Sequence, residues 1–279
     1  MCADGVDICK QERSALVTCA SGLQSSALVS RPHLNLDALQ LSLLLAGVVV
    51  VAFLYSSVGH AGASGYIAVM SLCGLTAGFI RPTALVLNIL VACIGAFQFW
   101  RAGHFSWTLF WPFALLSVPC AYFGGSLQLP SALLKVLIGA VLLFSAARLF
   151  FRPRDAVETT RPARPLAIVA GAAIGFLSGV TGTGGGIFLT PLLLFCRWST
   201  IKRAAAVSVL FILVNSIAGL AGFLTSRQTV PSSAWLLAVG AVIAGTAGSY
   251  LGSQRFPART ISLLLATVLV IAGCKLLFT

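Results

Sequence analysis

The sequence has little charge. Only 9% of its 279 residues are Asp, Glu, Lys or Arg, whereas 58% are hydrophobic, and the mean hydropathy is +1.00. Soluble domains carry about 25% charged residues, so this chain has too few charges to cover a water-facing surface. The composition excludes an ordinary soluble enzyme and a disordered protein. It also argues against a nucleic-acid partner, despite a net charge of +12.

Acidic residues are the scarcest charged type. The six of them are Asp4, Asp7, Glu12, Asp37, Asp155 and Glu158. Asp37 lies at the start of the first apolar segment, and none lies in the interior of a segment. Carboxylates inside the membrane are the usual proton and cation relays of pumps and transporters. The sequence therefore argues against a Na⁺ or H⁺ relay built from Asp or Glu.

Catalytic and cofactor motifs are also missing. The sequence has no His-Glu-x-x-His, no Gly-x-Ser-x-Gly and no paired carboxylates, which are the common signatures of metalloproteases, hydrolases and acid–base enzymes. The eight cysteines show no metal-ligand or redox spacing. We therefore expect no enzyme activity, no metal and no cofactor.

Long apolar segments are what the chain does contain. A membrane-spanning helix needs roughly 20 mostly apolar residues, whereas barrel strands need about ten with alternating polarity. The pattern predicts an all-α, polytopic membrane protein. The predicted segments are 36–58, 65–80, 83–100, 107–128 and 131–151, followed by 165–180, 184–198, 203–224, 232–253 and 258–278.

The segments fall into two halves. Gly59-x-x-Gly62-x-x-Gly65 lies 120 positions before Gly179-x-x-Gly182-x-x-Gly185, and ordered matches of this kind indicate duplication. The predicted organisation is a polar mobile tail (1–35), a first membrane repeat (36–151), a basic linker (152–164) and a second membrane repeat (165–279).

The number of crossings in each half decides the relation between the halves. Five crossings make the repeats inverted, whereas four make them parallel, as happens if the second segment of each half is re-entrant. Outside the tail, Lys and Arg gather on the linker side when five crossings are assumed. The positive-inside rule then favours inverted halves with a cytoplasmic linker.

The glycine-rich loops before the short segments suggest an anion site. Glycine lets a ligand approach the backbone closely, and the first N–H groups of a helix are free and carry partial positive charge. Broken helices of this type hold substrates near the membrane midplane. The candidate binding residues of the second loop are Thr181, Gly182, Thr183, Gly184 and Gly185, and those of the first loop are Gly62, Ser64 and Gly65.

Other polar residues have two possible roles. Asn88 and Asn215 could line the site, or they could form hydrogen bonds between helices. His60 could carry a coupling proton, or it could make a structural hydrogen bond. Arg81, Lys202 and Arg203 could attract an anion, or their side chains could extend to the membrane surface.

Two further glycine stripes have the spacing of helix-packing motifs rather than of a binding loop. These are Gly171-xxx-Gly175-xxx-Gly179 and Gly248-xxx-Gly252. Small residues four positions apart let membrane helices approach closely, so we assign both stripes to packing.

The loops resemble a known family. The stretches 178–194, 59–66 and 81–88 are similar to those of the TauE/SafE family of sulfite exporters, although Ala61, Ala63 and Ser64 stand where that family often has glycine. The resemblance implies a protein of the bacterial cytoplasmic (inner) membrane that moves sulfite, sulfonates or related small sulfur oxyanions.

The sequence thus predicts a secondary transporter, an exporter by resemblance, for a small sulfur oxyanion held by glycine-rich helix N-termini. The alternatives are a passive anion channel and, weakly, a membrane-embedded enzyme. The expected partners are the small anionic substrate and the lipid bilayer, and a homo-oligomer is left open.

Overall fold

The computed structural model describes residues 37–127, 162–225 and 234–257, single residues 143, 160, 230 and 231, and part of 259–274. The tail, most of the linker and the fifth segment of the first half lie outside these residues. The predictions made for them are therefore not addressed below.

Every regular element among the described residues is helical, as predicted. Six helices are long and apolar enough to cross a membrane. They are α2 (Ala38–Ser57), α4 (Ala77–Arg101), α5 (Trp107–Ser126), α7 (Arg164–Thr181), α9 (Ile201–Thr225) and α10 (Ala234–Tyr250), the last continuing into the π-helical turn η1 (Leu251–Arg255). The short helices α3 (Ala63–Leu72) and α8 (Gly186–Phe195) have ten residues each.

The outer faces of these helices are apolar. Val239 and Ile243 of α10 are 62% and 67% exposed, which is favourable against lipid and costly against water. Exposed tryptophans lie at helix ends, namely Trp100, Trp107 and Trp235, as in the aromatic belts at membrane interfaces. The chain is a multi-pass membrane protein.

One predicted boundary was wrong. The sequence placed the second segment at 65–80, but α3 ends at Leu72 and α4 already begins at Ala77. Gly74, with φ +75°, stops α3. The third segment, predicted from residue 83, therefore begins earlier. Pro82 lies inside α4, since membrane helices tolerate proline when neighbouring groups satisfy the freed backbone.

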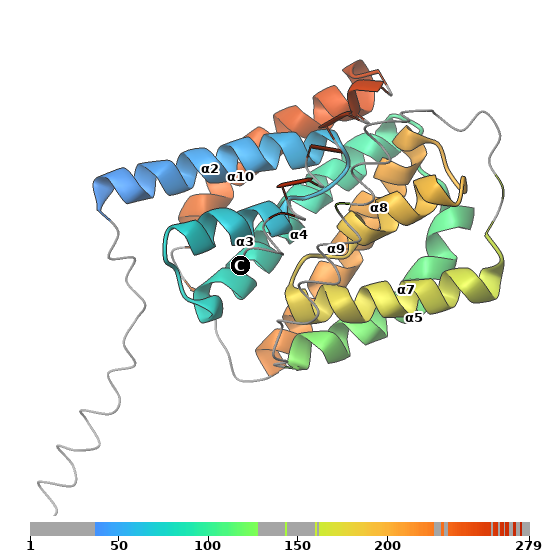
Figure 1. The fold of residues 1–279 in the computed structure, drawn as a ribbon, viewed down its shortest axis with the longest axis horizontal. Coiled ribbons are helices and arrows are strands. Elements are labelled where there is room, and N and C mark those ends of the chain that lie inside the picture. The colour runs from blue at the N-terminus through green and yellow to red at the C-terminus, as the bar shows by residue number, and fades with distance from the viewer. Residues whose placement is uncertain are drawn as a thin grey trace, which may run out of the picture. The chain divides into compact units, whose positions relative to one another are not determined.

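The glycine stripes bring two helix pairs into backbone contact (Figure 1). On α7, Cβ atoms at Gly171, Gly175 and Gly179 would collide with the backbone of α5. On the other pair, Gly248 and Gly252 meet the backbone of α2 in the same way. The assignment of both stripes to helix packing is confirmed.

These contacts fix the directions of the paired helices. In the α2–α10 pair, Gly248 faces Phe53 and Gly252 faces Ser57, so the two helices run parallel. The contacts of Gly171 with Phe113 and of Gly175 with Ser117 likewise make α5 and α7 parallel.

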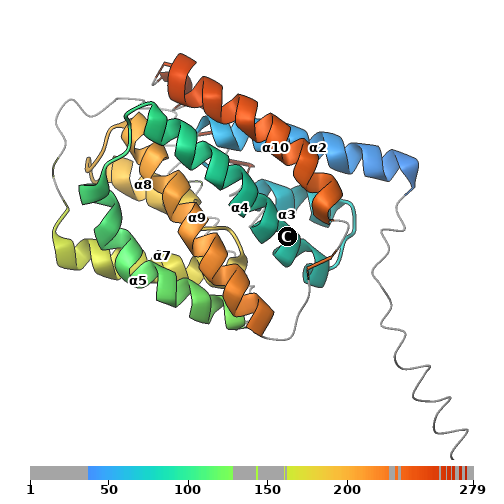
Figure 2. The same cartoon turned by 180° about the vertical axis from the view of Figure 1, so that it is seen from behind.

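The central helices cross in opposite directions. Gly95 of α4 faces Val209 of α9, whereas Leu85 faces Gly219, so α4 and α9 are antiparallel (Figure 2). Contacts of α4 with α10 and of α5 with α9 are parallel. Helices α2, α4 and α10 therefore run one way and α5, α7 and α9 the other, with α3 returning the chain between α2 and α4.

The two halves correspond at a different register from the predicted one. The left-handed glycines Gly59 and Gly62 precede α3 as Gly182 and Gly185 precede α8. This offset is 123 positions rather than 120, because the backbone bends, not the glycine spacing, define equivalent places. Duplication and inversion remain predictions, which the opposite directions of corresponding helices support.

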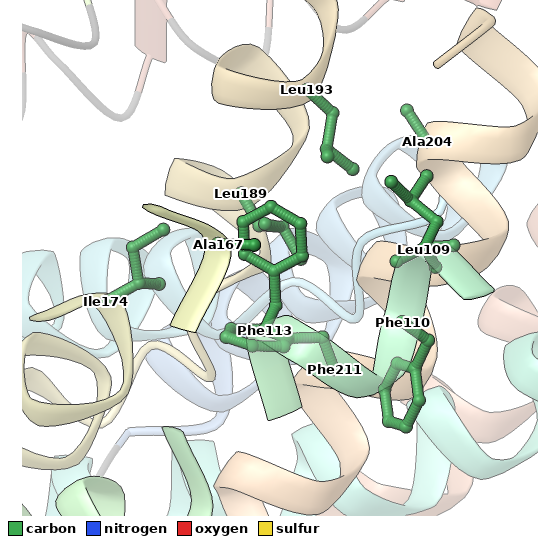
Figure 3. Packing of buried hydrophobic residues seen from close by; sticks show 10 residues of the cluster. Leu109, Phe110, Phe113, Ala167, Ile174, Leu189, Leu193, Ala204 and Phe211 are labelled. Atoms are coloured by element: carbon green, nitrogen blue, oxygen red, sulfur yellow. The ribbon is translucent and has the colours of Figure 1, made fainter. Parts of the chain in front are cut away.

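An apolar cluster holds α8 in place (Figure 3). Leu189 and Leu193 of α8 are fully buried and pack against Phe113 of α5 and Phe211 of α9. Because lipid is as apolar as leucine, this packing stabilises α8 through van der Waals contacts rather than through exclusion of water. The cluster fixes α8 so that its glycine-rich N-terminus points into the protein.

Candidate functional site

Two buried loops form the centre of the site. One joins α2 to α3 through Gly59 and Gly62, and the other joins α7 to α8 through Gly182, Gly184 and Gly185. All five glycines have φ between 74° and 103°, a region that other residues rarely adopt. The sequence folds into these bends because glycine supplies the left-handed positions that precede each short helix.

His60 joins the two loops. Its Nε2 lies 3.0 Å from the carbonyl oxygen of Gly186 and 3.0 Å from Oγ1 of Thr190. The carbonyl can only accept, and the Thr190 hydroxyl already donates to Ser208, so Nε2 carries the hydrogen and donates to both. The buried Nδ1 has no partner among the described residues and keeps a free lone pair.

Asn88 also joins the loops. Its Oδ1 accepts a hydrogen bond from the Ala63 N–H at 3.0 Å, which caps the first turn of α3. Its Nδ2 lies 3.4 Å from the Thr183 carbonyl and 3.3 Å from the Ser216 hydroxyl, and donates to both. Asn88, predicted to line the site, therefore connects the two loops, and both its Oδ1 and its Nδ2 have hydrogen-bond partners.

The N-terminus of α8 is open and lacks the side-chain cap that Asn88 gives to the Ala63 N–H of α3. The N–H groups of residues 183–187 have no acceptor within the described part of the chain, and the first helical bonds come from Phe188 and Leu189 to the Gly185 carbonyl. Free N–H groups at the positive end of a helix form a site for an anion.

The two threonines of the second loop lie beside these N–H groups. Oγ1 of Thr181 and Oγ1 of Thr183 are 2.9 Å apart, and both residues are half-buried whereas Gly184 and Gly185 are buried. Because the Thr181 hydroxyl donates to the Leu177 carbonyl at 2.7 Å, the Thr183 hydroxyl is the donor between the two threonines.

Aromatic side chains cover the first loop. A Cβ at Gly62 would meet the Tyr66 ring, and one at Gly65 would meet the ring of Tyr55. The Ser64 hydroxyl donates to the Tyr55 hydroxyl at 3.1 Å. Gly62, Ser64 and Gly65, predicted as ligands, therefore contact tyrosines instead of an open space.

Asn215 lies on α9 next to the second loop. Its Oδ1 accepts from the Ser117 hydroxyl at 2.8 Å, and its Nδ2 is buried with no partner among the described residues. Although Asn88 and Asn215 were predicted as a matched pair, the structure gives them different partners.

Arg81 caps helix ends rather than facing solvent. Its guanidinium donates to the carbonyls of Gly124, Gly125 and Leu127 at the end of α5, and to that of Gly179 in α7. The negative ends of two helices thus hold this charge, which differs from both roles considered from the sequence.

Lys202 and Arg203 lie in the first turn of α9, away from the second loop. Lys202 is half-buried and Arg203 exposed. His104 lies in the loop before α5, and burial lowers its pKa. A hydrogen bond with the Ser253 carbonyl raises this pKa, and the charges of Lys202 and Arg203 lower it further. Lys202 and Arg203 make this end of the protein electropositive, whereas the lowered pKa of His104 favours its neutral form.

The sequence did not predict the residues that surround His60 and the first loop. Thr190, Ser208, Tyr55 and Tyr66 belong to the site but were not proposed for it. A threonine inside the apolar segment 184–198 was the available clue, because a hydroxyl in hydrocarbon needs a partner.

The fold and the site define a class. Two short helices begin at buried bends in the interior of a polytopic helical protein, and their N-termini meet through Asn88 and His60. Discontinuous helices of this kind are the binding elements of secondary transporters.

Comparison with known proteins identifies the family. The model of the family "Sulfite exporter TauE/SafE" matches residues 43–276, and the chain belongs to this family. A probable membrane transporter protein, y4hK of Sinorhizobium fredii, is 42% identical over 236 residues, which are 82% of this chain and 95% of that protein.

More distant relatives carry similar names. The probable membrane transporter protein MJ0441 of Methanocaldococcus jannaschii is 31% identical over 53% of this chain and 57% of its own length. The probable membrane transporter protein YjnA of Bacillus subtilis is 26% identical over 86% of this chain and its own full length. No solved structure matches the chain. The family and these names indicate a membrane transporter rather than an enzyme, and bacterial relatives fit a bacterial inner membrane.

Proposed function

We propose that the protein is a secondary transporter that exports a small sulfur oxyanion, such as sulfite or an organosulfonate. The observation that carries the proposal is the open N-terminus of α8, where the N–H groups of residues 183–187 have no acceptor among the described residues. The family description supports the choice of substrate.

The electrostatics of the site favour an anion over a cation. The described residues of both loops contribute N–H groups, hydroxyls and amides but no carboxylate. Preorganised dipoles act more strongly inside a protein than in water, because the effective dielectric constant is lower. Backbone N–H donors at the start of α8 can therefore replace part of the anion's hydration shell without a buried positive side chain.

The packing favours a transporter over a permanently open channel. A Cβ at Gly184 would lie 2.7 Å from Nδ2 of Asn88 and 2.7 Å from a methyl carbon of Ile212, so the second loop packs closely against α4 and α9. Corresponding helices run in opposite directions, which supports inverted repeats. In such folds one repeat rocks against the other to expose the site alternately.

Sulfite flux in proteoliposomes tests the function. We expect purified protein to accelerate efflux of labelled sulfite, and unlabelled sulfite outside to accelerate it further, since a carrier exchanges substrates. Protein-free liposomes give the leak rate. A channel would instead give efflux without exchange and single-channel currents. Failure to move sulfite, methanesulfonate or taurine would contradict the proposed substrate class.

His60 is proposed to carry a coupling proton, because its Nδ1 lone pair is buried and free. In His60→Gln the amide can still donate to Gly186 and Thr190, but it cannot be protonated near neutral pH. We expect sulfite flux without a pH gradient to stay within about twofold of wild type and stimulation by a gradient to disappear. Stimulation that persists in the variant would leave His60 with a structural role only.

A further inference from the structure

The two central asparagines are not equivalent. Asn88 closes the N-terminus of α3 by accepting from the Ala63 N–H. Asn215, in the corresponding helix of the other half, directs its Oδ1 to Ser117 of α5 instead. Its Nδ2 has no acceptor within the described residues, and neither do the N–H groups that begin α8. The first N–H of α3 therefore has a side-chain acceptor, whereas the N–H groups at the start of α8 have none among the described residues.

Asn215 lies on the face of α9 that covers the glycine loop. Cβ atoms built on Gly184, Gly185 and Gly186 would contact three α9 residues, Phe211, Ile212 and Ser216. Positions 211, 212, 215 and 216 share one face of a helix, since neighbours along a helix face are three and four residues apart. Asn215 is fully buried, so its amide N–H₂ lies within the protein beside this loop.

Ser178 contributes a second unpaired donor. Its side chain is 1% exposed, and Oγ has no partner among the described residues. A Cβ at Gly185 would lie 3.2 Å from the Ser178 Cβ, which places this hydroxyl next to the N-cap of α8. A buried donor without an acceptor costs about 1–3 kcal/mol, so two of them beside free N–H groups indicate that an acceptor-rich ligand completes the site.

We propose that the transported anion binds at the N-terminus of α8, with Nδ2 of Asn215 and Oγ of Ser178 as its side-chain donors. This inference rests on the proposed function and specifies its site. Asn88 is a positioning residue that caps the first N–H of α3. Because all donors are neutral and converge from two sides, the site selects a group with several oxygens on one centre, as in a sulfonate.

Binding of methanesulfonate to detergent-solubilised protein tests the inference, since a sulfonate stays ionised over the whole working pH range. In Asn215→Asp, the carboxylate can still accept from Ser117 but places negative charge where Nδ2 was. We expect affinity to fall by at least tenfold at neutral pH, in line with loss of a charge-assisted hydrogen bond, and to recover at low pH as the carboxyl becomes protonated and donates.

Ser178→Ala provides a second, milder variant, and we expect an affinity loss of about fivefold with unchanged thermal stability. Gln98→Leu is the matched control, because this amide bonds Thr246 on the outer side of α4, and its affinity should equal that of wild type. Wild-type affinity in both Asn215→Asp and Ser178→Ala would overturn the inference. Wild-type protein that binds no sulfonate or sulfite would instead contradict the proposed function itself.

Discussion

Replacing Arg81 with alanine is expected to destabilise the protein more than any other single change of a charged residue described above. The guanidinium donates at 2.6 Å to the Gly179 carbonyl and at 3.0–3.3 Å to Gly124, Gly125 and Leu127. It also lies 5.6 Å from the centre of the Phe223 ring. Its removal leaves the ends of α5 and α7 without donors in a partly buried place.

The expected loss of stability follows from the carbonyl groups that lose their hydrogen-bond donor. Each buried acceptor that loses its partner costs about 1–3 kcal/mol, and water reaching this half-buried site recovers part of that. We expect Arg81→Ala to lose at least about 3 kcal/mol. Arg81→Lys should be intermediate, because an ammonium lacks the planar fork of donors.

Thermal unfolding in detergent measures this prediction. Arg101→Ala is the matched control, because Arg101 lies in the last turn of the same helix and is exposed. Its melting temperature should stay close to that of wild type. If Arg81→Ala melts at the wild-type temperature, the capping role is wrong, and reduced transport by such a stable variant would favour attraction of an anion.

In the other half, the backbone groups at the helix end are satisfied without an arginine. Gly59 packs against Ala205 as Gly182 packs against Arg81. Helix α10 ends in the π-helical turn η1, where the Phe256 N–H donates to the Leu251 carbonyl at 2.7 Å. The wider turn satisfies backbone groups at the end of α10 locally. Arg81 is therefore needed only where α5 and α7 end without such a turn.

The sequence predicted the elements better than their contacts. Apolar runs located the six long helices, because lipid exposure requires apolar residues on nearly every face. The predicted segment 184–198 located α8 (Gly186–Phe195) to within three residues at each end. The end of α3 was misplaced, because a single glycine, Gly74, ends the helix inside a stretch that is apolar on both sides.

The site was predicted by residue type but not by partner. The glycine loops were found from composition alone, since their density exceeds what helix packing uses. Asn215 accepts from Ser117, which lies 98 residues away in the chain. Asn88 accepts from Ala63, which lies 25 residues away. No local pattern contains that information. Corresponding residues in two halves are expected to share a role, and here their neighbours assign different ones.

Replacing Gly184 with alanine is expected to abolish transport. The backbone of Gly184 is left-handed, with φ +77°. A side chain in this conformation costs about 1 kcal/mol of strain. The new Cβ lies 2.7 Å from Nδ2 of Asn88 and 2.9 Å from the Ser216 hydroxyl, distances that real Cβ atoms do not show. Asn88 must move, which releases both the Thr183 carbonyl and the Ala63 N–H.

We expect sulfite flux in Gly184→Ala to fall below about a tenth of wild type, because displacement by an ångström at a site that preorganises donors costs about 100-fold. Gly78→Ala is the matched control, since a Cβ there has no neighbour within 4 Å. It should transport like wild type and melt at the same temperature or slightly above, because alanine favours a helix over glycine.

A double-mutant cycle shows whether the damage passes through Asn88. If the new methyl acts by displacing this amide, Gly184→Ala combined with Asn88→Ala will be no worse than Asn88→Ala alone, because residues in contact are not additive. Additive losses in flux would mean that Gly184 acts by another route, such as direct contact of its backbone with the anion. Full flux in the single variant would remove the second glycine loop from the mechanism.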